Sequence, residues 1–388
     1  MRIGINALFF QHPATGSGQY MRHLLEALSQ VDQHNEYVLL GPQPVTNGST
    51  ANIPYPYYVR PVPGLAANHE NIAKVVWEQL TGPAAARKTN VDIFHVPYFA
   101  APLLSRTPTV ITIHDAIPLL LPAYRADAKV RAYMSLVARA SRNASMVITV
   151  SQHAKQDIMR TLKLPTERIR VIYEAAGDEY QPITDVDMLA AARARYGVGE
   201  RYVFYLGGLD QRKNVLQLVR AFAQVYRDVG DPNLQLLISG DPDKRGALFP
   251  DPRPVVTELG MEEHILFRFV EDQDKPAMYS GTSLFVFPSL YEGFGLDPLE
   301  AMSCGAPVVC SNRTSLPEVV GDAALTVDPE DTRALAEAMS NVLTNPGLQA
   351  DLKQRSLQRA ARFNWHTTAT ETLSVYEEAF ARTKTAKG

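Results

Sequence analysis

Residues 283–311 read SLFVFPSLYEGFGLDPLEAMSCGAPVVCS, and this stretch gives the clearest indication of the fold. An apolar run of strand length is followed by a loop with two glycines, a helical segment from about Leu296, and a second apolar run. Both runs are continuously apolar, which is typical of strands that helices bury on both faces. The stretch therefore predicts a strand–helix–strand unit within a parallel sheet.

Similar apolar runs lie on both sides of this stretch and form two series. The first comprises residues 3–10, 36–41, 57–62, 92–97, 108–114, 145–150 and 168–173, and the second comprises residues 202–208, 234–240, 264–270, 283–289, 307–311 and 324–329. Segments of helical periodicity separate them, for example at residues 125–144. The predicted fold class is α/β, with two Rossmann-like, doubly wound parallel sheets in tandem.

A polar stretch at residues 178–187, followed by a helical segment, separates the two series. The chain has 388 residues, more than the roughly 250–300 at which a single core stops growing. We therefore expect an N-terminal domain over residues 1–178 and a C-terminal domain over residues 200–365. Ligands of such sheets bind at the carboxyl ends of the strands, so two facing sheets are expected to place a ligand in the cleft between them.

Composition excludes several classes of protein. A formal charge of -3 and a pI near 6.3 give no electrostatic reason to expect nucleic-acid binding. The two cysteines, Cys304 and Cys310, are expected to be small buried side chains rather than a disulfide framework. The first ten residues are too short for a signal peptide, and no run approaches the roughly 18 apolar residues of a spanning helix. We expect a soluble, cytoplasmic protein.

The loop Glu292-Gly293-Phe294-Gly295 precedes the helix that begins near Leu296. Helix N-termini bind phosphate through their unpaired N–H groups, and glycines let a ligand approach the backbone. A carboxylate such as Glu292, or Glu300 in the helix, can accept hydrogen bonds from two adjacent hydroxyls of a ribose or a hexose. Either glutamate alone is more simply explained as a surface charge.

The whole string resembles the signature of retaining glycosyltransferase family 4, in which seven residues separate two glutamates and a run like AMSCGAPV follows. The segment SLPEVVGDAAL at 315–325 also resembles the family, and the resemblance spans nearly the whole chain. It implies the two-domain GT-B architecture, with the acceptor on residues 1–175 and the donor nucleotide on residues 200–330. It also implies a last helix, about 366–384, that returns to the first domain. The main departure is Asp297, to which we assign no role.

A basic pair, Arg212 and Lys213, follows a strand end and two glycines in YLGGLDQRKNV at 205–215. Alone, the pair would be a solvated charge pair at the start of a helix. The resemblance instead implies contact with the donor diphosphate, where the cations would neutralise charge on the leaving group. The donor-binding residues implied are Gly16, Gly18, Gly208, Arg212, Lys213, Glu292, Gly293, Phe294, Gly295, Leu296 and Glu300.

Candidates in the N-terminal half follow strand ends. The loop GSGQY at 16–20 lacks the GxGxxG dinucleotide fingerprint, so NAD binding is not expected. The resemblance instead implies that Gly16 and Gly18 lie in a loop near the donor phosphates and the acceptor. His114 ends the strand at 108–114, and the resemblance places it near the donor sugar. Asp115 and Glu174 are possible acceptor contacts, although Glu174 could equally turn the chain. The resemblance implies that the amphipathic segment 72–83 contacts the acceptor or a membrane. The simpler alternative is that this segment packs in the core.

The resemblance implies sugar transfer with retention of the anomeric configuration. The catalytic residues would be His114, Arg212, Lys213 and Glu292, with no metal and no cofactor besides the nucleotide-sugar co-substrate. We expect GDP-mannose as the donor, or UDP-glucose as the second choice, and a glycan or lipid-linked glycan as the acceptor. The protein would act in the cytoplasm, with peripheral membrane contact left open. The alternatives are a nucleotide-sugar epimerase, or a nucleotide-sugar-binding protein without activity.

Overall fold

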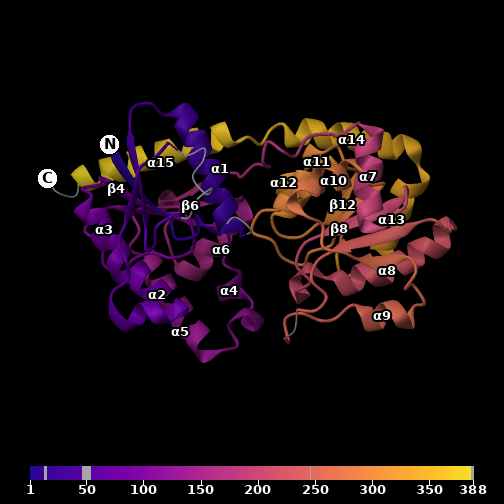
Figure 1. The fold of residues 1–388 in the computed structure, drawn as a ribbon, viewed down its shortest axis with the longest axis horizontal. Coiled ribbons are helices and arrows are strands. Elements are labelled where there is room, and N and C mark those ends of the chain that lie inside the picture. The colour runs from indigo at the N-terminus through magenta and orange to yellow at the C-terminus, as the bar shows by residue number, and fades with distance from the viewer. Residues whose placement is uncertain (13–14, 46–53, 245, 386–388) are drawn as a thin grey trace. The chain divides into compact units, whose positions relative to one another are not determined.

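The computed structural model describes residues 1–12, 15–45, 54–244 and 246–385. Its contacts divide the chain into two compact units (Figure 1). Unit 1 comprises residues up to Glu174 together with the chain from Asn364 onward, and unit 2 comprises Ala175–Phe363. The first unit therefore ends slightly before the boundary expected from the sequence, and it includes the C-terminal segment.

Unit 1 is built on a seven-stranded parallel sheet in the order β3-β2-β1-β4-β5-β6-β7. Its strands are β1 (Arg2–Asn6), β2 (Glu36–Gly41), β3 (Tyr57–Val59), β4 (Ile93–Val96), β5 (Thr109–Ile113), β6 (Met146–Thr149) and β7 (Ile169–Val171). Its helices are α1 (Gly16–Val31), η1 (Gly64–Asn68), α2 (Glu70–Val76), η2 (Trp77–Thr81), α3 (Gly82–Lys88), α4 (Ile117–Leu120), η3 (Pro122–Arg125), α5 (Ala128–Ser141), α6 (Gln152–Leu162), η4 (Thr166–Arg168) and α15 (Trp365–Thr385).

The two faces of this sheet have separate apolar cores, because successive strand side chains point to opposite faces. In β2, Tyr37 and Leu39 pack in one core with helices α1 and α15. Val38 and Leu40 pack in the other, which includes Trp77 and residues of α3 and α6. Helices thus cover both faces, as the continuous apolar runs predict.

Unit 2 is built on a six-stranded parallel sheet in the order β10-β9-β8-β11-β12-β13. Its strands are β8 (Tyr202–Leu206), β9 (Gln235–Ser239), β10 (Ile265–Phe267), β11 (Leu284–Phe287), β12 (Val308–Ser311) and β13 (Ala324–Val327). Its helices are α7 (Val186–Tyr196), η5 (Gln211–Lys213), α8 (Val215–Val229), α9 (Arg253–Glu258), η6 (Asp272–Asp274), α10 (Lys275–Gly281), α11 (Leu296–Ser303), α12 (Leu316–Val320), α13 (Thr332–Thr344) and α14 (Pro346–Ala360). Cys304 and Cys310 are both buried and free.

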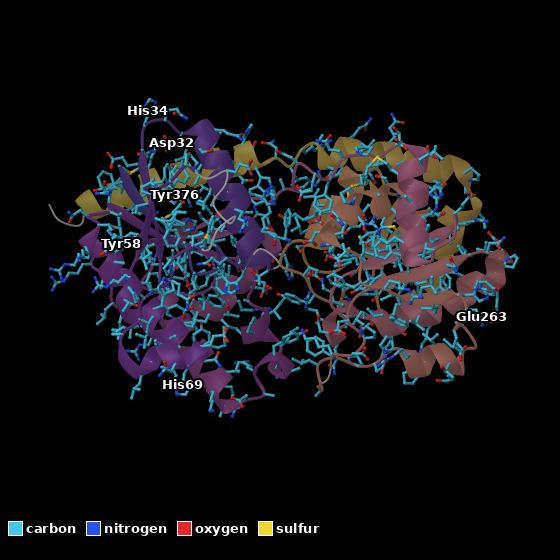
Figure 2. The ribbon with its side chains drawn as sticks, in the orientation of Figure 1. Asp32, His34, Tyr58, His69, Glu263 and Tyr376 are labelled. Carbon is cyan, nitrogen blue, oxygen red and sulfur yellow. The ribbon has the colours of Figure 1, made fainter. Side chains whose placement is uncertain are left out.

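The C-terminal helix α15 belongs to the core of unit 1. It packs against α1 and reaches β4, β5 and β6, as its yellow ribbon shows in Figure 1. Tyr376, labelled in Figure 2, lies on this helix and is fully buried. Its hydroxyl lies 2.7 Å from His95 Nδ1, and His95 Nε2 lies 2.9 Å from Thr112 Oγ1. A polar chain of hydrogen bonds therefore connects the end of the sequence with β4 and β5.

Two expected boundaries are wrong. The first strand ends at Asn6 rather than at Phe10, because residues 7–12 turn away and Phe10 packs into the core on its own. The segment GSGQY is not a loop, since helix α1 begins at Gly16. The Thr15 hydroxyl caps this helix by accepting a hydrogen bond from Gly18 N.

Candidate active site

The carboxyl ends of β8 and β11 form the topological switch point of unit 2. From β8 the sheet continues to β9 on one side, and from β11 it continues to β12 on the other. Ligands of doubly wound sheets bind at this point. The loops that follow the two strands, residues 207–214 and 288–295, contain the predicted basic pair and the first glutamate of the motif.

An ion cluster joins these two loops. Glu292 Oε1 lies 2.7 Å from Arg212 Nη1 and 2.9 Å from Lys213 Nζ, and accepts a hydrogen bond of 2.6 Å from Ser289 Oγ. No charged side chain of the three is more than 14% exposed. Burial opposes ionisation of Glu292, but the charges of Lys213 and Arg212 outweigh it and lower the pKa of this carboxyl. Glu292 is therefore a carboxylate held by two cations.

Asp297 is a further member of this cluster that the sequence analysis passed over. Its Oδ2 lies 3.3 Å from Lys213 Nζ, which also lies 4.4 Å from the centre of the Phe287 ring. Burial by itself would lower the pKa of Lys213, but Glu292 and Asp297 outweigh it and raise the pKa. An acidic residue in the first turn of a helix is a common preference, so its sequence position gave no distinct signal.

Backbone contacts anchor the basic turn η5 to the loop after β11. The Arg212 carbonyl accepts hydrogen bonds from Leu290 N at 2.7 Å and from Ser289 Oγ at 3.1 Å. Asn214 has a left-handed φ of 60°, which asparagine tolerates better than most residues. Its side-chain amide donates to the carbonyls of Pro288 and Pro329. The cations are thus fixed relative to Glu292 by main-chain as well as side-chain contacts.

The glycine loop has a conformation that its sequence requires. Gly295 has φ 131°, and a Cβ there would lie 2.8 Å from Leu316 Cδ2. The Phe294 side chain is 5% exposed and packs edge-on against Phe363, so its ring faces the core. Leu296 begins the eight-residue helix α11, whose first N–H groups have no partner within the helix. Beyond Glu292, the loop therefore offers backbone rather than side chains to a ligand.

Glu300 lies in the second turn of α11 and is 6% exposed, so it is not a surface charge. Tyr279 Oη donates to its Oε2 at 3.4 Å, and Tyr180 also hydrogen-bonds to the carboxyl group. Burial, reinforced by the charge of Asp297, raises the pKa of Glu300 well above its usual value. Burial and the neighbouring charges thus shift the pKa values of the two glutamates in opposite directions.

The candidate residues of unit 1 gather at the ends of β5 and β7. His114 Nδ1 lies 2.7 Å from Glu174 Oε1, and the Tyr20 ring packs edge-on against the imidazole at 4.8 Å. Burial by itself would lower the pKa of His114, but the carboxylate of Glu174 outweighs it and raises the pKa. Glu174, whose role the sequence left open, is therefore an ion-pair partner of the histidine.

Other predicted residues have local partners. Asp115 Oδ1 accepts a hydrogen bond from Ile117 N and so stabilises the start of α4. Gly18 is buried, and a Cβ there would lie 2.1 Å from the His12 carbonyl oxygen, so loop packing alone requires this glycine. Gly16 and Gly208 are exposed, and Gly208 O accepts a hydrogen bond from Tyr205 Oη at 2.6 Å. Their proposed contacts with the donor remain predictions.

The segment 72–83 contributes to the core at one point. Trp77 is fully buried, and its Nε1 donates to Asn6 Oδ1 at 2.9 Å. In residues 1–12, 15–45, 54–244 and 246–385, no helix is long and apolar enough to cross a membrane. The same residues contain no group of three or more His, Cys, Asp or Glu side chains placed to hold a metal ion.

Comparison with known proteins assigns the family. The model of the group 1 glycosyl transferases matches residues 192–359, and the model of glycosyltransferase family 4 matches residues 14–176. O-antigen chain mannosyltransferase B of Escherichia coli is 30% identical over 382 residues, which are 95% of this chain and 97% of that protein. The chain belongs to glycosyltransferase family 4. The family predicted from the sequence is confirmed.

Other relatives of this glycosyltransferase match over only part of their length. The serotype-specific mannosyltransferase WbdA of Escherichia coli is 32% identical over 265 residues, which are 67% of this chain but only 32% of WbdA. A D-inositol 3-phosphate glycosyltransferase of Corynebacterium glutamicum is 29% identical over 249 residues, 62% of this chain and 58% of that protein.

Solved structures confirm the fold class. Sucrose-phosphate synthase of Thermosynechococcus elongatus superposes with a TM-score of 0.73 at 24% identity, over 98% of this chain and all of that one. Anabaena HepE, in complex with UDP and glucose, superposes with a TM-score of 0.72 at 20% identity, over 97% and 99% of the two chains. The glycosyltransferase therefore has the two-Rossmann GT-B architecture.

Proposed function

We propose that this glycosyltransferase transfers mannose from GDP-mannose to a glycan or lipid-linked acceptor in polysaccharide biosynthesis, with retention of configuration and without a metal ion. The buried cluster of Arg212, Lys213 and Glu292 at the switch point of unit 2 is the observation that most supports this proposal. It places two fixed cations beside a hydrogen-bond acceptor at the position where doubly wound sheets bind nucleotides.

The choice of mannose rests on relatives. The proteins that are 30% and 32% identical to this chain are both named mannosyltransferases, and one acts on an O-antigen chain. HepE, which binds UDP and glucose, shares only the fold. UDP-glucose is therefore the second choice of donor. We place the reaction in the cytoplasm, with the acceptor presented at the inner face of the membrane.

In the proposed reaction the donor diphosphate takes the place of Glu292 beside Arg212 and Lys213. An arginine guanidinium and a lysine ammonium are both good phosphate ligands, and their charges stabilise the diphosphate as the glycosidic bond breaks. Glu292, released from the cations, then accepts hydrogen bonds from hydroxyls of the transferred sugar. The leaving phosphate takes the proton of the attacking acceptor hydroxyl, so no carboxylate nucleophile is required.

The remaining candidates have defined parts in this scheme. Glu300 would bind the ribose hydroxyls from its buried position on α11. The backbone N–H groups at Gly293–Leu296 would contact the phosphate and sugar, as helix N-termini do. His114, whose pKa Glu174 raises, would hydrogen-bond a hydroxyl of the sugar. Gly16, Gly18 and Gly208 would allow close approach of the phosphates.

Two alternatives share the architecture, namely a nucleotide-sugar epimerase and a binding protein without activity. A thermal-shift screen with GDP-, UDP-, ADP- and dTDP-sugars addresses the donor, because a bound ligand raises stability by mass action. Saturating GDP-mannose at about 100 times its dissociation constant should add about 2.7 kcal/mol of stability. No shift with any nucleotide sugar would contradict the proposal, and a shift without transfer to any glycan would favour the binding protein.

A further inference from the structure

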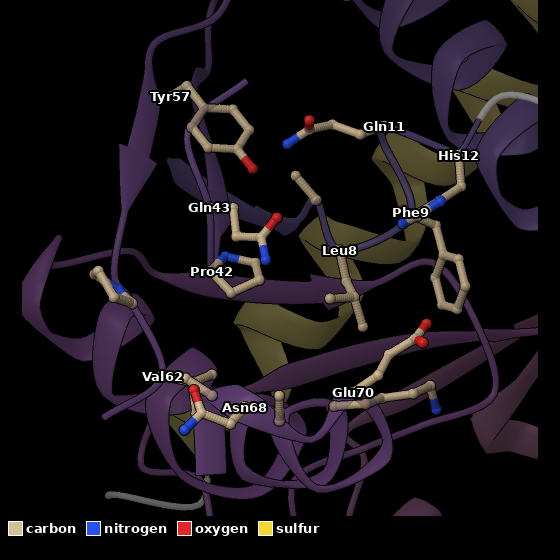
Figure 3. A pocket seen from close by; sticks show the side chains of 15 residues that line it. Leu8, Phe9, Gln11, His12, Pro42, Gln43, Tyr57, Val62, Asn68 and Glu70 are labelled. Atoms are coloured by element: carbon tan, nitrogen blue, oxygen red, sulfur yellow. The ribbon is translucent and has the colours of Figure 1, made fainter. Parts of the chain in front are cut away.

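Unit 1 contains a cavity of about 710 Å³ beside the carboxyl ends of β1, β2 and β3. This volume lies within the roughly 300–1,000 Å³ typical of small-molecule sites. Figure 3 shows Tyr57, Gln11 and Gln43 on one side and Asn68 and Glu70 on the other, with Leu8 and Phe9 between them. The described lining thus combines an aromatic and aliphatic wall with amide and hydroxyl groups.

The Tyr57 hydroxyl is positioned by its neighbours. It packs against the Gly41 backbone, where a Cβ would lie 1.7 Å from Tyr57 Oη, so only glycine leaves it room. Gln11 hydrogen-bonds to this hydroxyl and also donates to the Pro44 carbonyl at 3.0 Å. Hydrogen-bonding groups held in this way are suited to a ligand with several hydroxyls, such as a pyranose.

Lys74 is the single lysine or arginine among the described lining residues, and its charge is already balanced. Its Nζ lies 2.7 Å from Glu78 Oε1, and the Glu78 side chain is only 1% exposed. The Lys74 ammonium also donates to the Tyr133 hydroxyl, which in turn donates to both Glu78 oxygens, at 3.1 and 3.0 Å. The exposed Glu70 adds a negative charge to the lining.

The buried position of Glu78 arises from an irregular helix. Residues Trp77–Thr81 form a π-helical turn between α2 and α3, and such turns occur often at functional sites. Trp77 and Glu78 are both buried here, and Tyr98 hydrogen-bonds to Glu78 and to Asn6 at the end of β1. The Glu78 carboxylate is therefore buried next to Lys74, which carries a desolvation penalty that an apolar side chain at this position would not have.

We propose that this cavity binds the uncharged pyranose end of a glycan and, because Glu78 neutralises Lys74, discriminates against phosphorylated ligands. A phosphate dianion placed here would meet Glu70 and a lysine already paired, and would be desolvated without a compensating cation. The inference rests on the proposed function only in identifying this ligand as the acceptor.

The test compares α-mannobiose with the same disaccharide phosphorylated at its non-reducing O6, by ligand-observed NMR titration of the full chain without nucleotide. The wild type should bind the uncharged disaccharide at least tenfold more tightly. Glu78→Gln should bind the phosphorylated ligand at least tenfold more tightly than the wild type does, because the charge of Lys74 is then no longer balanced by a carboxylate. The double variant Lys74→Met/Glu78→Gln should lose this gain in affinity. Glu26→Gln, an exposed glutamate on α1, changes the net charge equally and should leave both affinities unchanged.

Asn68→Ala should weaken binding of the uncharged disaccharide at least fivefold. This result would locate the ligand in the cavity even if Glu78→Gln fails to fold. Equal or tighter binding of the phosphorylated disaccharide to the wild type would overturn the inference, as would an unchanged preference in a folded Glu78→Gln protein or unaltered binding in Asn68→Ala. Nucleotide-sugar binding is measured separately by thermal shift. Disaccharide binding without any nucleotide-sugar response would therefore refute the proposed function and leave the cavity assignment standing.

Discussion

The ammonium of Lys213 lies 2.9 Å from Glu292 and 3.3 Å from Asp297, and Arg212 shares the first of these carboxylates. A diphosphate that binds the two cations must therefore exchange with a carboxylate that already holds them. The exchange favours the state in which phosphate charge is greatest, because Coulomb energy in a buried site grows with charge. This charge grows as the sugar–phosphate bond breaks, so the cations stabilise the transition state more than the bound donor.

This exchange predicts the effect of removing either cation. Arg212→Ala and Lys213→Ala should each lower kcat more than donor affinity, by about 10²–10³, the usual cost of losing one preorganised group that stabilises developing charge. Single-turnover rates and donor dissociation constants, measured on the same preparations, separate the two quantities. If donor binding and kcat/KM fell equally while kcat stayed normal, the cations would serve only uniform binding.

Glu300 leads to a prediction about both ligand and pH. Glu300→Ala should weaken GDP-mannose binding by about 1.5–3 kcal/mol for each hydrogen bond lost from a charged partner. Because the pKa of Glu300 is raised in the folded protein, its carboxyl costs stability as pH rises above the unfolded value. Glu300→Gln should therefore be more stable than the wild type at pH 8 and equal to it at pH 4 in urea unfolding. An unchanged donor dissociation constant in Glu300→Ala would exclude ribose binding.

The His114–Glu174 pair should make both the His114 pKa and the stability of the fold depend on Glu174. Glu174 raises the pKa of His114, so the pair stabilises the fold fully below the unfolded histidine pKa and loses this contribution as pH rises through the folded pKa. Glu174→Gln should lower the His114 pKa, measured from the imidazole C–H resonance, and should lower stability at pH 5.5 more than at pH 9. The exposed Glu26→Gln is the matched control. A His114 titration that is identical in both variants would show that Glu174 does not set its charge.

At the scale of single elements, the strands were predictable because all five residues of β8 and all four of β11 are buried and apolar. The end of β1 could not be predicted, because Phe9 and Phe10 continue the apolar run in the sequence. Only their packing in three dimensions shows that the chain turns before them. The partnership of His114 and Glu174, 60 residues apart, depends on β5 and β7 ending at one edge of the sheet. Asp297 was assigned no role from the sequence for the same reason, since its contact with Lys213 spans 84 residues.

Helix α15 should contribute measurably to the free energy of unfolding of unit 1. Tyr376→Phe leaves His95 Nδ1 without its partner in a fully buried site, where burial lowers the pKa of His95 to about 3 and keeps the ring neutral. An unpaired buried polar atom costs about 1–3 kcal/mol, so urea unfolding should show a loss of this size. Tyr58→Phe, on the edge strand β3, removes a hydroxyl from a half-buried ring and should change stability by less. Equal effects of the two changes would contradict a structural role for the α15 hydrogen bond.

At the scale of the whole molecule, two sheets that share the order of their first six strands place different chemistry at their carboxyl edges. Unit 2 provides buried cations and glutamates suited to a nucleotide sugar, and unit 1 provides the histidine–glutamate pair and a cavity without an uncompensated cation among its described lining residues. The family assignment covers both units. The reaction itself tests the proposed division between a donor unit and an acceptor unit.

The most direct measurement is the configuration of the product that the full chain forms from GDP-α-mannose and an uncharged mannoside acceptor in the presence of EDTA. The one-bond carbon–hydrogen coupling of the new anomeric centre distinguishes the two configurations by NMR. We predict an α-linked mannoside, formed at the same rate with and without EDTA. A β-linked product, or transfer that stops in EDTA and resumes with a divalent ion, would contradict the proposed retaining mechanism in which Arg212 and Lys213 take the place of a metal.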